Sequence, residues 1–199
     1  MKDPSFSKFH LIKELVTANQ IFEFKYRYGW ELQYYYSNRM NQIFIHHKKF
    51  PEEFLLKTQL KAEEGSMIYL KNFINNLDEL ISYEDNPYMI HKIKKLKDFY
   101  HDKKKAIKVF EEYQNQTKND LLMIYRLRNL IVHSAHFDYT LLPYFAWKIE
   151  SFTGNLLRKL IKDRSGKQFE LNDILFDIFH RKERLFNDLN NNSIDLIND

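Results

Sequence analysis

The chain has 199 residues, of which 44% are hydrophobic and 29% charged, with no cysteine and only four glycines and four prolines. This composition excludes a disordered or collagen-like chain, a disulfide framework, and thiolate metal ligands or nucleophiles. The formal charge of +4 permits an anionic partner without requiring one. No apolar run approaches the roughly 20 residues of a membrane-spanning helix, and the first residues lack the pattern of a signal peptide. We therefore expect a cytoplasmic protein with no membrane contact.

Apolar residues recur at spacings of three and four along most of the chain, which is the pattern of helices that pack on a core. The scarcity of glycine and proline favours long elements, and no stretch shows convincing strand alternation. A polar stretch at 115–119 predicts a connection, followed by an N-cap at Asn119 or Asp120. The predicted helices, in chain order, are Phe9–Asn38, Phe50–Ser82, Tyr88–Gln114, Leu121–Ser134, Thr140–Ile161 and Leu171–Leu189.

These helices predict an all-α, up-and-down bundle with four to five core helices and a C-terminal amphipathic helix. We expect the bundle to occupy residues 1–163. Residues 164–199 are predicted to hold the amphipathic helix and a frayed tail, which either belongs to the same domain or contacts a partner.

Lysines are concentrated between residues 91 and 108, where they are interleaved with aromatic residues. Such a run on one stretch of helix suits a phosphate backbone, although a solvated helix face is an equal alternative. The candidate RNA-binding lysines are Lys94, Lys95, Lys97, Lys104 and Lys105. Tyr34–Tyr36 is another aromatic cluster, and we interpret it as core rather than as a base-stacking platform.

The segment 125–134, Tyr-Arg-Leu-Arg-Asn-Leu-Ile-Val-His-Ser, places four polar side chains in an otherwise apolar run. Because such groups are costly to bury without partners, we expect a role for them. At about 100° per residue, Arg126, Asn129 and His133 form one stripe, whereas Arg128 points about 140° away from His133. His136 and Asp138 follow closely, and Asp138 is expected to cap the next helix.

The Arg-Asn-x3-His spacing of Arg128, Asn129 and His133, on a late helix of a small bundle, resembles the Arg-x4–6-His motif of the HEPN superfamily. Arg126 fits the looser form of the motif, so it is a second candidate for the arginine. The resemblance extends to the helix layout over residues 9–161. It implies a compact helical bundle and, as in many HEPN proteins, a metal-independent endoribonuclease that needs no cofactor.

The residue types suit that chemistry, in which a ribose 2′-OH attacks the adjacent phosphorus. Histidine exchanges protons near neutral pH, and arginine matches the geometry of phosphate and stays charged. The resemblance further implies a site shared across a homodimer, and a toxin or anti-phage effector controlled by an antitoxin or activating partner. The alternatives are a non-catalytic helical adaptor or immunity module, and a HEPN-like domain that binds nucleotides without cleaving them.

Overall fold

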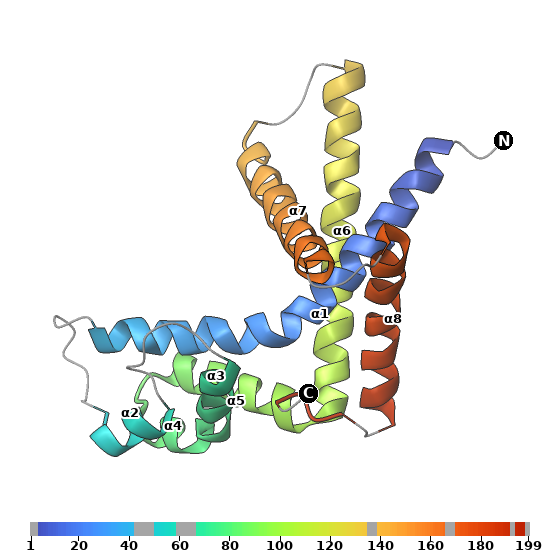
Figure 1. Cartoon of the computed structure of the whole chain (residues 1–199). Coiled ribbons are helices and arrows are strands. Elements are labelled where there is room, and N and C mark those ends of the chain that lie inside the picture. Colours follow the sequence, from blue (N-terminus) through green and yellow to red (C-terminus); the bar gives the residue numbers. More distant parts are fainter. Residues whose placement is uncertain are drawn as a thin grey trace. The chain divides into compact units, whose positions relative to one another are not determined.

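The computed structural model describes residues 4–41, 50–58, 67–134, 139–165, 170–191 and 194–197. Within these residues the chain forms helices and no strand, so the all-α prediction is confirmed (Figure 1). No helix of this described part is long and apolar enough to cross a bilayer. The helices are α1 (Pro4–Asn41), α2 (Glu52–Thr58), α3 (Met67–Asn75), α4 (Leu77–Tyr83), α5 (Pro87–His101), α6 (Lys103–Ser134), α7 (Leu142–Arg164) and α8 (Leu171–Asn190).

The predicted connection at 115–119 is wrong, because α6 runs through it without interruption. Thr117 in this stretch is buried, so packing outweighs the weak helix propensity of its polar neighbours. The break lies instead at Asp102, which separates α5 from α6. Its Oδ1 accepts hydrogen bonds from the backbone N–H groups of Lys104 and Lys105, at 3.1 and 3.2 Å. Asp102 thus caps α6, and the predicted helix over 88–114 is divided there.

The predicted helix from Phe50 to Ser82 is also divided, into α2, α3 and α4, with residues 59–66 outside the described part. Helix α5 begins at Pro87, one residue before the predicted start at Tyr88. Asn86 Oδ1 accepts from the Tyr88 N–H at 2.9 Å, and Pro87 occupies the first turn, where its missing N–H costs nothing.

The chain divides into two compact units, each built from separate stretches of sequence. The first unit contains Met1–Glu23 and Lys108–Asn187, and the second contains Phe24–Ile107 and Asp188–Asp199. Helices α1, α6 and α8 each contribute residues to both units.

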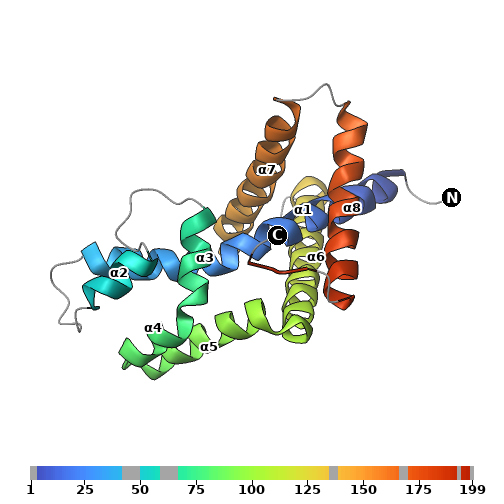
Figure 2. The ribbon, with the colours of Figure 1, turned by 60° about the horizontal axis from the view of Figure 1, so that its bottom comes forward.

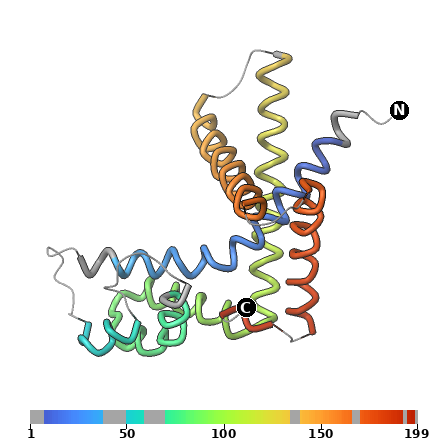
Figure 3. Tube along the Cα trace, viewed as in Figure 1, coloured from blue at the N-terminus to red at the C-terminus, as the bar shows by residue number. Residues whose placement is uncertain are grey.

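In the first unit, α1, α6 and α7 share a core of Val16, Leu121 and Phe152. Helix α8 lies alongside the N-terminal half of α6 (Figures 1 and 3), where the rings of Phe110 and Phe186 are 6.2 Å apart. The amphipathic pattern predicted for the C-terminal helix is therefore used for packing within this unit.

In the second unit, α4 lies against α5 (Figure 2), and α1 packs on α5 through aromatic side chains. The ring of Phe99 contacts that of Tyr28 edge-on at 4.9 Å. The Tyr100 hydroxyl donates to the Lys25 carbonyl at 2.6 Å, and burial raises the pKa of Tyr100. Gly29 permits this approach, because a Cβ there would lie 2.7 Å from Tyr100 Oη.

Candidate functional site

The four predicted catalytic residues lie in the last turns of α6. Arg126, Arg128 and His133 are exposed, and Asn129 is half-buried. Because α6 stays a regular helix to Ser134, Arg126, Asn129 and His133 share one side of it, as the spacing predicts.

Arg128 starts from a different side of α6, but its side chain turns toward the stripe. Its Nη1 donates a hydrogen bond to Asn129 Oδ1 at 3.0 Å. The asparagine therefore orients the guanidinium that the ideal helix directs elsewhere. Both arginines remain on one accessible stretch of the helix.

The part of α6 that precedes the four polar residues is held by contacts with α1 and α7. The ring of Tyr125 stacks on Phe9 of α1 with centroids 4.2 Å apart. Asp120 pairs with Lys148 of α7 at 2.9 Å. Burial alone would lower the pKa of Lys148, but the hydrogen bond and charge of Asp120 outweigh it and raise that pKa. These contacts with α1 and α7 therefore fix the position of the part of α6 that carries the polar residues.

The last turn of α6 carries large apolar side chains before the histidine, and they are exposed. Leu130, Ile131 and Val132 are 52%, 37% and 58% exposed. In Figure 1 this end of α6 stands away from α7, the next helix along the chain. Since successive residues lie about 100° apart around a helix, these three side chains are exposed on different sides of the turn, and Val132 is the one that lies between Arg128 and His133.

The charges of the site are not neutralised within the described part of the chain. No acidic side chain there forms an ion pair with Arg126, Arg128 or His133. No group of metal-ligating side chains occurs among these residues either. His136 and Asp138, which follow the motif, lie outside them.

The five predicted RNA-binding lysines belong to the second unit and differ in their surroundings. Lys97 binds both carboxylate oxygens of Asp78, at 2.6 and 2.7 Å. Lys105 lies 2.9 Å from Asp98, which raises its pKa. The other three, Lys94, Lys95 and Lys104, are exposed.

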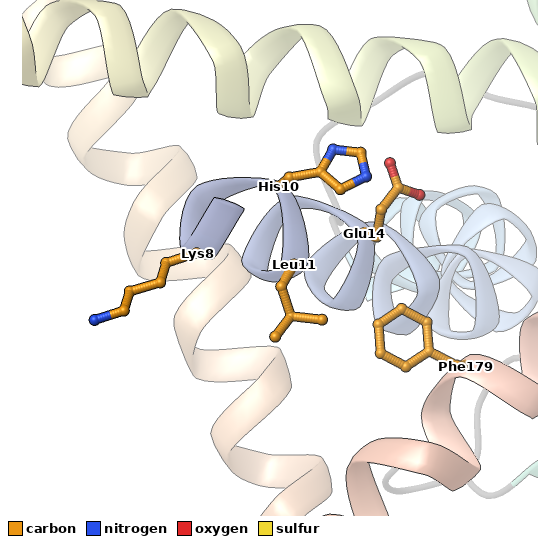
Figure 4. Close-up of a pocket in the computed structure, with 5 residues that line it drawn as sticks. All are labelled: Lys8, His10, Leu11, Glu14 and Phe179. Carbon is orange, nitrogen blue, oxygen red and sulfur yellow. The ribbon is translucent and has the colours of Figure 1, made fainter. Parts of the chain in front are cut away.

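A hollow in the first unit was not predicted, and Figure 4 shows its lining. It has a volume of about 490 Å³ and is lined by Lys8, His10, Leu11, Glu14 and Phe179. Glu14 is already paired with Lys118 at 3.1 Å. The hollow is lined mainly by apolar surface and carries no constellation with an evident chemistry.

Comparison of the chain with protein-family models, curated proteins and solved structures finds no match. Its function is therefore argued from its own residues.

Proposed function

We propose that this chain is a metal-independent endoribonuclease of the HEPN type. The observation that carries the proposal is the accessible end of α6, where Arg128 is oriented by Asn129 and lies within about two helical turns of both Arg126 and His133. The lack of acidic partners for these groups, within the described residues, leaves their charge available to a phosphate.

The proposed reaction needs a base, an acid and a cation at the phosphate, and one chain supplies a histidine and two arginines toward them. A base removes the proton of the ribose 2′-OH, whose oxygen attacks phosphorus, and the 5′ oxygen leaves with a proton. His133 exchanges one of these protons, and Arg128 or Arg126 binds the phosphoryl oxygens as charge builds on them. The products are a 2′,3′-cyclic phosphate and a 5′-hydroxyl.

The site is proposed to be completed by a second copy of the chain. Arg128 precedes His133 by five residues, or about 7.5 Å along the axis, and helical side chains lean toward the N-terminus. Arginine and histidine of one helix therefore do not converge well. Two α6 ends packed antiparallel would bring the arginine of one chain to the histidine of the other, and would cover Val132, which lies between them around the helix.

This dimer is tested by a charge placed in the apolar turn. Val132→Asp should convert a dimeric parent into a monomer in analytical ultracentrifugation, because the carboxylate would be buried without a partner. Leu56→Asp, at an exposed leucine of α2, is the matched control and should leave the dimer intact. A parent that is monomeric at all concentrations contradicts the shared site.

The enzymatic proposal is tested by incubating the protein with single-stranded and structured RNA in EDTA. The parent should yield 2′,3′-cyclic phosphate ends, and His133→Ala should lower the rate by about 100-fold or more. His101→Ala is the control, since His101 is also an exposed histidine in the last turn of its helix. Equal cleavage by the parent and His133→Ala would refute the assignment.

The resemblance to HEPN proteins extends the proposal to a biological role. Such a ribonuclease would act in the cytoplasm as a growth-arresting toxin or anti-phage effector, controlled by an antitoxin or an activating partner. Expression of the parent should then arrest growth, and expression of His133→Ala should not.

A second candidate function is a non-catalytic helical interaction module, and α7 is the element that favours it. Trp147, Leu157 and Ile161 are exposed at spacings that place them on one side of this helix. Gly154 lies between them, and a Cβ there would meet nothing within 4 Å. Absence of cleavage by a folded parent, with and without cell extract, would favour this function.

A further inference from the structure

A groove between α1 and α5 lies wholly within the second unit. Lys95, one of the predicted RNA-binding lysines, lines it, but the proposed catalysis assigns the groove no role. Its volume is about 580 Å³, which is within the range of small-ligand sites. Its lining includes Glu31 and Tyr35 of α1 and Tyr88, Lys92 and Lys95 of α5.

The floor of this groove is apolar and rigid. Leu32, Met89 and Leu96 are buried beneath it. The two helices are held together by the contact of Tyr28 with Phe99 and by the hydrogen bond from Tyr100 described above. The groove is therefore formed in advance rather than on binding, which reduces the entropic cost of binding a ligand.

One aromatic side chain and two lysines follow one another along the wall that α5 provides. Tyr88 is 61% exposed in the first turn of α5, and Lys92 follows four residues later with its Nζ 4.8 Å from the centre of the Tyr88 ring. Lys95 continues the same face one turn further. An exposed ring beside two ammonium groups offers a surface for a base and a site for its phosphate.

The opposite wall contributes Tyr35 and an acidic residue, Glu31. Arg27 lies 3.8 Å from the Glu31 carboxylate and offsets its charge. The lysines therefore dominate the electrostatics of the groove, and the aromatic rings dominate its shape.

We propose that this groove binds one nucleotide of single-stranded RNA, with the base stacked on Tyr88 and the phosphate held by Lys92 and Lys95. The choice of RNA, rather than another anion with an aromatic ring, rests on the proposed function. The groove is a binding site for substrate outside the catalytic residues of α6.

The test measures binding without cleavage, by fluorescence anisotropy of a labelled single-stranded RNA 10-mer in EDTA with the His133→Ala protein. In this background, Tyr88→Ala should weaken binding by about 5- to 100-fold, as the loss of one stacked base does. Its control is Tyr34→Ala, an exposed tyrosine of α1 that does not line the groove. Replacing both Lys92 and Lys95 by alanine should also reduce the log–log salt slope by about 1.4.

A second double variant controls for the loss of two positive charges. Lys71→Ala with Lys162→Ala removes two exposed lysines elsewhere and should leave the salt slope unchanged. Equal effects of the two lysine pairs, or of Tyr88→Ala and Tyr34→Ala, would overturn the assignment of the groove. Binding that depends on the groove in a parent protein that never cleaves RNA would support this inference and reject the ribonuclease. Cleavage of RNA that the groove variants do not change would support the ribonuclease and reject the groove as a substrate site.

Discussion

The close packing at Gly29 provides a stability test with an internal control. In Gly29→Ala, the new Cβ would lie 2.7 Å from Tyr100 Oη and 2.8 Å from Leu70 Cδ1. Both neighbours are buried, and the Tyr100 hydroxyl is committed to the Lys25 carbonyl. Something must move, and each movement either disturbs the core or weakens that hydrogen bond.

The magnitude follows from three opposing effects. Overpacking a core by one methyl group costs about 1–3 kcal/mol, and losing a typical hydrogen bond costs about 1 kcal/mol. Replacing glycine by alanine inside a helix stabilises the protein by about 1 kcal/mol. Gly29→Ala should therefore lower the free energy of unfolding by about 2 kcal/mol, which for a chain of this size lowers Tm by about 4–8 °C.

The assay is thermal and urea unfolding followed by circular dichroism, with Gly154→Ala as the control. Gly154 is also inside a helix, but a Cβ there meets nothing within 4 Å, so this change should be neutral or stabilising by up to about 1 kcal/mol. Adding Tyr100→Phe to Gly29→Ala removes one of the clashing atoms and should recover part of the loss. If Gly29→Ala proves as stable as Gly154→Ala, the close packing of α1 on α5 is refuted.

Two acidic residues of the first unit, each in an ion pair, give further tests. Asp163 lies beside the buried Lys159 and 3.8 Å from Arg181 of α8. Asp163→Asn should therefore lower the free energy of unfolding in urea by about 1–3 kcal/mol. An unchanged urea midpoint would show that these ion pairs do not contribute to stability. Asp120 raises the pKa of Lys148 in the folded state. The pairing of these two residues therefore stabilises the folded protein at pH values below the usual lysine pKa, and this contribution disappears as the pH rises through the raised pKa. The difference in stability between the parent and Asp120→Ala should thus narrow at strongly alkaline pH, and a difference that widens there would contradict the pairing.

The prediction of secondary structure succeeded where local signals agreed and failed where packing overrode them. The start of α5 was predicted to within one residue, and the structure shows that Asn86 caps it by accepting from the Tyr88 N–H. The polar stretch at 115–119 also resembles a connection, but burial of Thr117 keeps it helical. The cap at Asp102 was missed because the apolar spacing continues across it.

The geometry of the candidate site was also predicted only in part. Spacing alone placed Arg126, Asn129 and His133 on one side of a helix, and α6 has that geometry. Spacing directed Arg128 away, and only the side-chain hydrogen bond to Asn129 shows where its guanidinium lies. The ribonuclease function stays a proposal that the residue types suggest.

The sequence by itself determined that the chain is all-α, because helical periodicity is a local property that neighbouring residues express together. It also contained every residue of the polar stripe on α6. Only the tertiary structure decided that the helices divide between two units built from separate stretches, and that Tyr35 of α1 and Tyr88 of α5 line one groove. These facts depend on contacts between residues far apart in the chain, which periodicity and capping do not encode. Among the lysines, the fold likewise paired Lys97 with Asp78 and left Lys95 beside the groove, because charge alone does not say which neighbour packing will supply.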